Sequence, residues 1–312
     1  MKSFSLIVLC FVSLLGTSAL AQTEFYPKNT FDIRLLFGKS SGTSFCDLNG
    51  NTKFELLDKS LDIEQPKRNY IFEYLAYESG LRVEYAPKEN LVLFSEIPIV
   101  YHSLNQRADT TIYRIKDTVN MTYDTLKYKK QIGDYTLLQP SYFSIGARYK
   151  IYSKLAYVAV TGELRIPPGF HNGIQNDPGY EFLSDGAFEI HTGIILGVTF
   201  EKSWLESSFS YHLRGEELVD YLQVHTEFGL SNVPGAKIGV RLDYLQSMGN
   251  FNSAVEFDPR KTTLQENALK AGFLFNWFLT DNFYIDFSFG VNLLGKNTLN
   301  SSGFVTGIGV RF

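Results

Sequence analysis

The sequence predicts an all-β fold, a closed antiparallel transmembrane β-barrel of about twelve strands, with roughly ten to fourteen as the range. Three observations lead to this prediction. Apolar and polar side chains alternate along segments of about ten residues or more. Short and long connections between these segments follow one another in strict alternation. The chain ends on an aromatic residue, Phe312.

The composition is typical of a chain that meets lipid on one face and water on the other. Charged residues make up 20% of the 312 residues and aromatic residues 15%, while the mean hydropathy is only −0.09. Lipid-facing and lumen-facing residues cancel in such an average when they alternate along each strand. Because the net charge is −4, no basic surface indicates nucleic acid, and we expect no nucleic-acid partner.

The first residues have the pattern of an export signal. Lys2 precedes an apolar run over Leu6–Leu15, which is too short for a good spanning helix, and Ala19-Leu20-Ala21 supplies a cleavage motif. We therefore expect residues 1–21 to be a cleaved signal peptide and residues 22–312 to form one barrel domain. A membrane anchor is the alternative, and the cleavage motif and the polar sequence after it disfavour that interpretation.

Alternation is clearest near the C-terminus. From Phe283 to Leu293 every second residue is apolar, and most of the residues between them are polar or small. Similar strands are expected to begin near Phe188, Leu222, Ile238 and Leu269. A soluble sandwich would show the same alternation, but the length of these segments is close to the ~9–11 residues that a tilted strand needs to cross a bilayer.

The connections set the expected topology. The five short turns are Ala86–Asn90, Ile151–Lys154, Glu201–Ser203, Asn232–Gly235 and Thr280–Asn282. The six longer or more polar connections are Ser41–Lys67, Leu104–Asp134, Pro167–Asp185, Arg214–Leu218, Met248–Glu266 and Gly295–Ser301. Strand-like stretches within Leu104–Asp134 are expected to extend beyond the membrane, and Thr52–Ile63 is a candidate strand in the first loop.

These features predict insertion in the outer membrane of a double-membraned bacterium, with outer-membrane lipid as the surrounding partner. We expect the short turns to face the periplasm and the long loops to face outside. Outward aromatic residues near strand ends are expected to form interfacial girdles. These are Phe200, Trp204, Tyr211, Phe228, Tyr244 and Trp277.

The stretch from Tyr157 to Asn250 resembles a known family. A strand ends in Pro167-Pro168-Gly169, Ser184-Asp185-Gly186 precedes a long apolar strand, and Ser210–Gly215 precedes an acidic pair. This order is similar to the barrels called MetA-pathway-of-phenol-degradation-like, relatives of FadL-type channels. The resemblance implies passage of small, poorly soluble organic molecules. An evident N-terminal plug and an Asn-Pro-Ala motif, which FadL-type proteins have, are missing, so we expect no FadL-like hatch.

The inward faces of the expected strands carry acids and bases in nearly equal number. We take the following as lumen candidates: Arg82, Glu163, Arg165, Glu189, His191, His212, His225, Glu227, Arg241 and Asp243. A mixture of charges is typical of a narrow wet channel, whereas an ion-selective pore would show a ring of one sign. The alternative is a structural network that braces the barrel wall.

Two histidine–glutamate pairs have the spacing that places both side chains on one face of a strand. They are Glu189 with His191 and His225 with Glu227, and His212 lies on the strand between them. A metal site needs three or four convergent ligands. We expect these side chains to be too spread for one, so we expect no metal and no cofactor. A pH-sensitive constriction is a further interpretation, and ordinary polar lining of the lumen is the simplest one.

Three functions are compared. The preferred hypothesis is a channel or facilitator for small solutes, hydrophobic or aromatic ones included. The second is a plugged structural or interaction barrel that acts through its extracellular loops. The third is an outer-membrane enzyme, and it is disfavoured because the sequence has no His-x-Ser, Asp-x-His or Asp-x-Asp motif for a rim active site.

Phe312 closes an outward apolar row that begins at Phe304. We therefore expect the chain to end on the lipid face at the periplasmic rim. An aromatic end of this kind resembles the signal that the barrel-assembly machinery reads, so that machinery is an expected partner.

Overall fold

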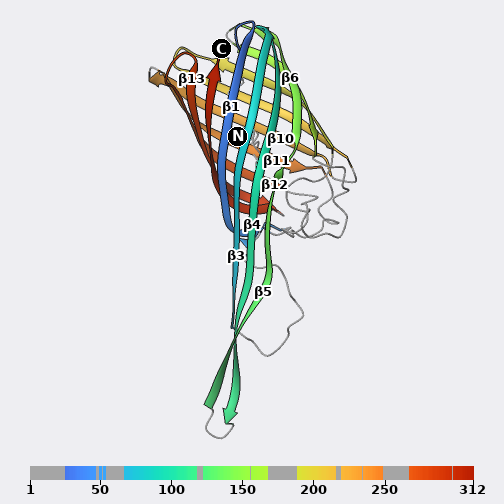
Figure 1. Ribbon diagram of the computed structural model, residues 1–312, viewed down its shortest axis with the longest axis vertical. Coiled ribbons are helices and arrows are strands. Elements are labelled where there is room, and N and C mark those ends of the chain that lie inside the picture. The colour runs from blue at the N-terminus through green and yellow to red at the C-terminus, as the bar shows by residue number, and fades with distance from the viewer. Residues whose placement is uncertain are drawn as a thin grey trace, which may run out of the picture.

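A computed structural model of the chain describes residues 25–46, 49–50, 52–53, 67–117, 122–154, 156–167, 188–215, 219–233, 235–248, 267–296 and 298–312. The expected signal peptide lies outside these residues. The described part forms a single antiparallel sheet that closes on itself (Figure 1). Within it, no helix is long and apolar enough to cross a membrane.

Fourteen strands are described, and twelve of them form the wall of the barrel, which confirms the predicted number. The wall strands are β1 (Thr30–Cys46), β3 (Lys67–Lys88), β4 (Leu91–Asp117), β6 (Phe143–Ser153), β7 (Ala156–Ile166), β8 (Glu189–Thr199), β9 (Ser203–Arg214), β10 (Tyr221–Val233), β11 (Ala236–Ser247), β12 (Asn267–Phe278), β13 (Phe283–Lys296) and β14 (Thr298–Arg311). Each pairs with the next, and β14 pairs with β1 from Arg311 and Asp32 to Thr298 and Cys46. Closure leaves no exposed sheet edge in the hydrocarbon layer.

The remaining two strands, β2 (Thr52–Lys53) and β5 (Thr122–Pro140), are not counted among the twelve wall strands. β2 pairs with the end of β1, and the rest of the expected Thr52–Ile63 strand lies outside the described residues. β5 pairs with β4 and leads into β6. The β4–β5 hairpin projects well beyond the barrel (Figure 1), as expected for this connection. We call the end of the barrel from which it projects the loop end, and the opposite end the turn end.

All five expected short turns join strands at the turn end, where β1 begins and β14 ends. One expected long connection, Gly295–Ser301, is wrong. There β13 runs to Lys296 and β14 starts at Thr298, with one residue between them. The strands continue because β14 keeps pairing with β1 up to Cys46. Polar side chains on both faces, which suggested a loop, are equally compatible with a strand in water beyond the lipid.

The outer face of the wall is apolar, as predicted. Exposed large hydrophobic side chains recur at every second position, such as Phe304, Ile308 and Val310 on β14. Val224 belongs to the outward row but is only 2% exposed, because it pairs with two larger residues, Phe209 and Tyr244. The outer face therefore presents a continuous apolar surface.

Most of the expected girdle aromatics lie on this face. Phe200, Tyr211, Phe228 and Trp277 are exposed, and Tyr244 is half-buried. Trp204 is a correction, because it is 3% exposed and shares the inward face of β9 with Glu206. The period-two pattern of β9, extended back from His212, would have placed Trp204 inside.

Four aromatic rings on the inner face lie over glycines of the neighbouring strand. The paired residues are Phe94 with Gly146, Tyr157 with Gly197, Trp204 with Gly229, and Tyr284 with Gly309. A Cβ atom added to Gly229 would come within 2.1 Å of the Trp204 ring. These glycines are needed because a ring occupies the space that a side chain would take.

We expect Gly229→Ala to lower the free energy of unfolding by about 1–3 kcal/mol, because the Trp204 ring must leave its position. Gly162→Ala is the matched control, since an added Cβ there meets nothing within 4 Å. Denaturant titration of the barrel in lipid vesicles, followed by circular dichroism, measures both. Equal stabilities of the two variants would contradict the tight ring-on-glycine packing.

Candidate functional site

The inner face of the wall carries many charged and polar side chains beside apolar ones such as Leu36 and Leu274, and they are largely withdrawn from solvent. Among the ten lumen candidates, Arg82, Glu163 and Arg165 are half-buried. The other seven, Glu189, His191, His212, His225, Glu227, Arg241 and Asp243, are buried. The structure brings them together as three clusters along the wall rather than as one ring.

The first cluster lies at the loop end, on β7, β8 and β9. Glu189 Oε2 lies 2.8 Å from His191 Nε2, and Glu163 Oε2 lies 3.4 Å from His191 Nδ1. Arg165 donates to Glu163 at 2.9 Å and lies 3.8 Å from Glu189. His212 is directly opposite His191, with ring centroids 3.6 Å apart. The two histidines that sequence reasoning placed on adjacent strands are therefore in contact.

The second cluster belongs to β10 and β11. His225 lies between two carboxylates: its Nδ1 contacts Asp243, and its Nε2 lies 2.9 Å from Glu227 Oε1. Arg241 Nε lies 3.2 Å from Asp243 Oδ2. Both ring nitrogens of His225 are thus directed at acids, so this cluster holds its charges in internal pairs.

The third cluster surrounds Glu84 nearer the turn end. Glu84 accepts a hydrogen bond from Arg82 at 2.8 Å and one from Arg148 at 2.6 Å. Tyr26, from the segment before β1, donates a third at 2.9 Å. Arg82 also pairs with Glu96 at 2.9 Å. Arg82 is the one lumen candidate of this cluster.

A neighbouring network joins β1, β13 and β14. Asp32 accepts hydrogen bonds from Tyr284 at 2.6 Å and from Arg311 at 3.2 Å. Arg34 lies 3.5 Å from both Asp32 and Asp286. Asp32 was missed by the sequence reasoning, although it is two residues before the inward Arg34 and the same alternation places it inside.

Phe25 and Tyr26, shortly before β1, place their side chains inside the turn end of the barrel. Tyr26 is 3% exposed and packs against Ala86 and Val92, and the Arg311 guanidinium lies 4.6 Å from the centre of its ring. The Phe25 ring is 6.2 Å from that of Tyr157. The sequence showed no evident plug, yet these two aromatic side chains enter the interior.

A cavity of about 390 Å³ lies beside these two residues. Aromatic rings line part of it, those of Phe25, Tyr26, Tyr157 and Trp204. Its charged lining residues are Lys150, Lys154, Lys237, Arg311 and Glu206. The turn end of the lumen therefore combines flat apolar surfaces with an excess of positive charge.

We expect Glu84→Ala to cost about 3–5 kcal/mol of unfolding free energy, because it leaves the buried Arg148 and the half-buried Arg82 without their shared acid. Glu89→Ala, in the exposed turn after β3, should change it by no more than about 0.5 kcal/mol. Urea titration of both variants in the same vesicles checks this. A small effect at Glu84 would mean that water replaces the carboxylate.

No protein-family model matches the chain, and no curated protein matches it significantly. Solved structures do match. The COG4313 outer membrane channel from Pseudomonas putida F1 has a TM-score of 0.63 at 11% identity, over 94% of this chain and 99% of the other. A FadL homologue from Pseudomonas aeruginosa has a TM-score of 0.38 at 9% identity, over 92% and 90%.

The class of this protein follows from the fold. A closed barrel of twelve strands with an apolar outer face and a polar inner face is an outer-membrane β-barrel. The match to the Pseudomonas putida channel shows the same fold along almost the whole length of both chains.

Proposed function

We propose that this barrel is an outer-membrane channel that lets small organic solutes, hydrophobic and aromatic ones included, cross the membrane. The observation that carries the proposal is the cavity at the turn end, with its aromatic rings and its cations. Flat rings stack on aromatic solutes, and cations attract a carboxylate or phenolate group. In the proposed orientation of the barrel in the membrane, the loop end faces the outside of the cell and the turn end faces the periplasm.

The charge pattern of the wall supports a passage rather than an ion-selective pore. The three clusters pair acids and bases within short distances, for example Arg148 with Glu84 at 2.6 Å and Arg165 with Glu163 at 2.9 Å. A single-sign ring would favour one class of inorganic ion. A wall whose charges are already paired leaves selection to shape and to the lining of the cavity.

The proposal is tested by solute flux into vesicles that contain the purified barrel. We expect benzoate to enter faster than benzylamine, a cation of similar size, because Lys150, Lys154 and Lys237 lie at the cavity. Lys150→Gln with Lys154→Gln should reduce this difference. A barrel that is folded but passes neither solute, and shows no conductance in planar bilayers, would overturn the proposal.

The β4–β5 hairpin favours a second candidate function, the binding of a partner. Its two strands pair from Ile99 and Pro140 to Asp117 and Thr122, with register shifts after Gln106 and Ile115, far beyond the length that a bilayer requires. A paired ribbon of this length presents its surface well outside the barrel (Figure 1). Removal of residues 106–131 should leave solute flux intact and abolish partner binding if the hairpin serves this function.

A further inference from the structure

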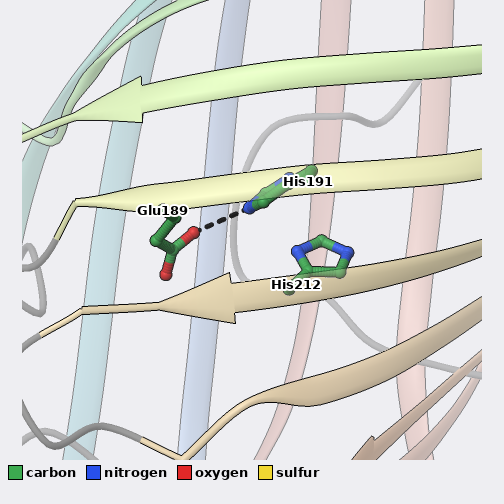
Figure 2. Close-up of side chains that lie close together, drawn as sticks. All are labelled: Glu189, His191 and His212. Carbon is green, nitrogen blue, oxygen red and sulfur yellow. Dashed lines mark hydrogen bonds and ion pairs between the residues drawn. The ribbon is translucent and has the colours of Figure 1, made fainter.

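We propose that Glu189, His191 and His212 bind a divalent transition-metal ion, with Zn²⁺ as its representative, at the loop end of the barrel interior. Figure 2 shows the three side chains, with Glu189 and His191 on one strand and His212 on the next. One ligand atom from each lies within 4.8 Å of the others. This convergence is tighter than the sequence suggested, and it does not depend on the proposed solute.

The register of the sheet produces the convergence. Glu189 and His191 are two residues apart on β8, so both point to the interior. His212 is the residue of β9 directly opposite His191. Two neighbouring strands thus present two imidazoles and one carboxylate on a rigid wall, which is a better platform for a metal site than a loop.

The distances fit an ion after a small adjustment. Bond lengths of about 2.1 Å place the ligand atoms of a tetrahedral Zn²⁺ about 3.4 Å apart. Glu189 Oε2 and His191 Nε2 are already 2.8 Å apart, and the full set lies within 4.8 Å. Side-chain rotations that move the ligand atoms by about 1 Å would therefore complete the site. Two histidines and one carboxylate also match a zinc site that keeps a position open.

A second observation points to a ligand. His212 is 3% exposed, and its Nδ1 has no hydrogen-bond partner among the described residues. Its Nε2 lies 2.9 Å from Ser210 Oγ, and its ring stacks on Tyr221 at 4.2 Å between centroids. The imidazole is thus held in place while one nitrogen is buried without a partner, which is costly unless something binds there.

The surroundings provide the outer partner that metal-binding histidines usually have. Glu163 Oε2 lies 3.4 Å from His191 Nδ1, the nitrogen opposite the one that faces Glu189. A carboxylate in this position fixes the ring and raises its basicity as a ligand. Arg165 lies 3.8 Å from Glu189 and would compete with the ion for it, so the two imidazoles carry most of the selectivity. Imidazole ligands favour Zn²⁺ or Cu²⁺ over Mg²⁺ or Ca²⁺.

The test is Zn²⁺ binding by the full-length barrel, folded in detergent and cleared of metal with a chelator. Isothermal titration calorimetry should give one ion per barrel. Glu163→Gln should weaken binding by about 10–100-fold, and His191→Gln with His212→Gln should weaken it further. Co²⁺ bound to the wild type should show a ligand-field spectrum that the double variant lacks.

His225→Gln is the matched control, because it removes another buried interior histidine and leaves the three ligands in place. It should bind Zn²⁺ like the wild type. Heat-modifiable migration on gels shows which variants are folded. If the histidine double variant does not fold, the nearly isosteric Glu189→Gln takes its place in the test. Absence of Zn²⁺ binding by the folded wild type would overturn the proposal. Undiminished Zn²⁺ binding by the variant that combines His191→Gln with His212→Gln, or by Glu189→Gln, would overturn it as well.

Discussion

Replacing Phe312 with aspartate is expected to reduce the amount of folded barrel in the outer membrane of living cells severalfold. Phe312 is 62% exposed, and it is the last residue of the seam that closes the barrel. Its backbone N–H donates to Phe31 O at 3.0 Å, and Phe31 N–H donates to Phe312 O at 2.8 Å. The two rings are stacked with their centroids 5.9 Å apart.

The magnitude of the loss separates two causes. A charge on the lipid face near the interface costs only about 0–1 kcal/mol, and the backbone hydrogen bonds of the seam do not depend on the side chain. If folding stability alone were affected, the amount of folded barrel in cells would therefore change little. A severalfold loss supports the proposal that the terminal aromatic residue is a signal for the assembly machinery.

Refolding into lipid vesicles without any machinery provides the comparison. There we expect Phe312→Asp to fold nearly as well as the wild type. Leu279→Asp is the matched control, since Leu279 is an exposed apolar residue at the same turn end but is not terminal. It should assemble normally in cells. Equal behaviour of the two aspartate variants in cells would remove the special role of the last residue.

Tyr26→Ala is expected to raise the single-channel conductance severalfold. Tyr26 occupies the turn end of the lumen and is held by Glu84 at 2.9 Å and by the Arg311 guanidinium over its ring. Loss of the phenol ring releases the segment around Tyr26 from these contacts. The space that the ring occupied is then added to the adjacent cavity of about 390 Å³. Conductance rises steeply when the narrowest part of a pore widens, so this single side chain should have a large effect.

Lys28→Ala is the control for this prediction, because Lys28 is exposed in the same segment. Planar-bilayer recordings of both variants and of the wild type measure the effect. Removal of Phe25–Pro27 should reproduce the increase. If Tyr26→Ala conducts like the wild type, the narrowest part of the passage lies elsewhere, and the loop-end cluster around His191 becomes the next candidate.

The alternation of apolar and polar residues was enough to predict the barrel, its twelve strands and the five short turns. It also assigned Arg82, Glu189 and Asp243 to the inner face, and the structure has these side chains half-buried or buried. Alternation succeeds here because a strand has only two faces, so one outward residue assigns all the others. The alternation was misapplied at Trp204. Because Trp204 is close to a turn, it was assigned to the interfacial girdle, although the alternation along β9 places its ring inside.

The sequence by itself therefore determined the fold class and the face on which each side chain lies. Tertiary structure alone decided which inward residues meet. The contact between His191 and His212 depends on the register of β8 against β9, and the rings of Tyr157 and Trp204 need glycines directly opposite them. A period of two carries no information about register, because shifting a strand by two residues preserves every face and changes every partner.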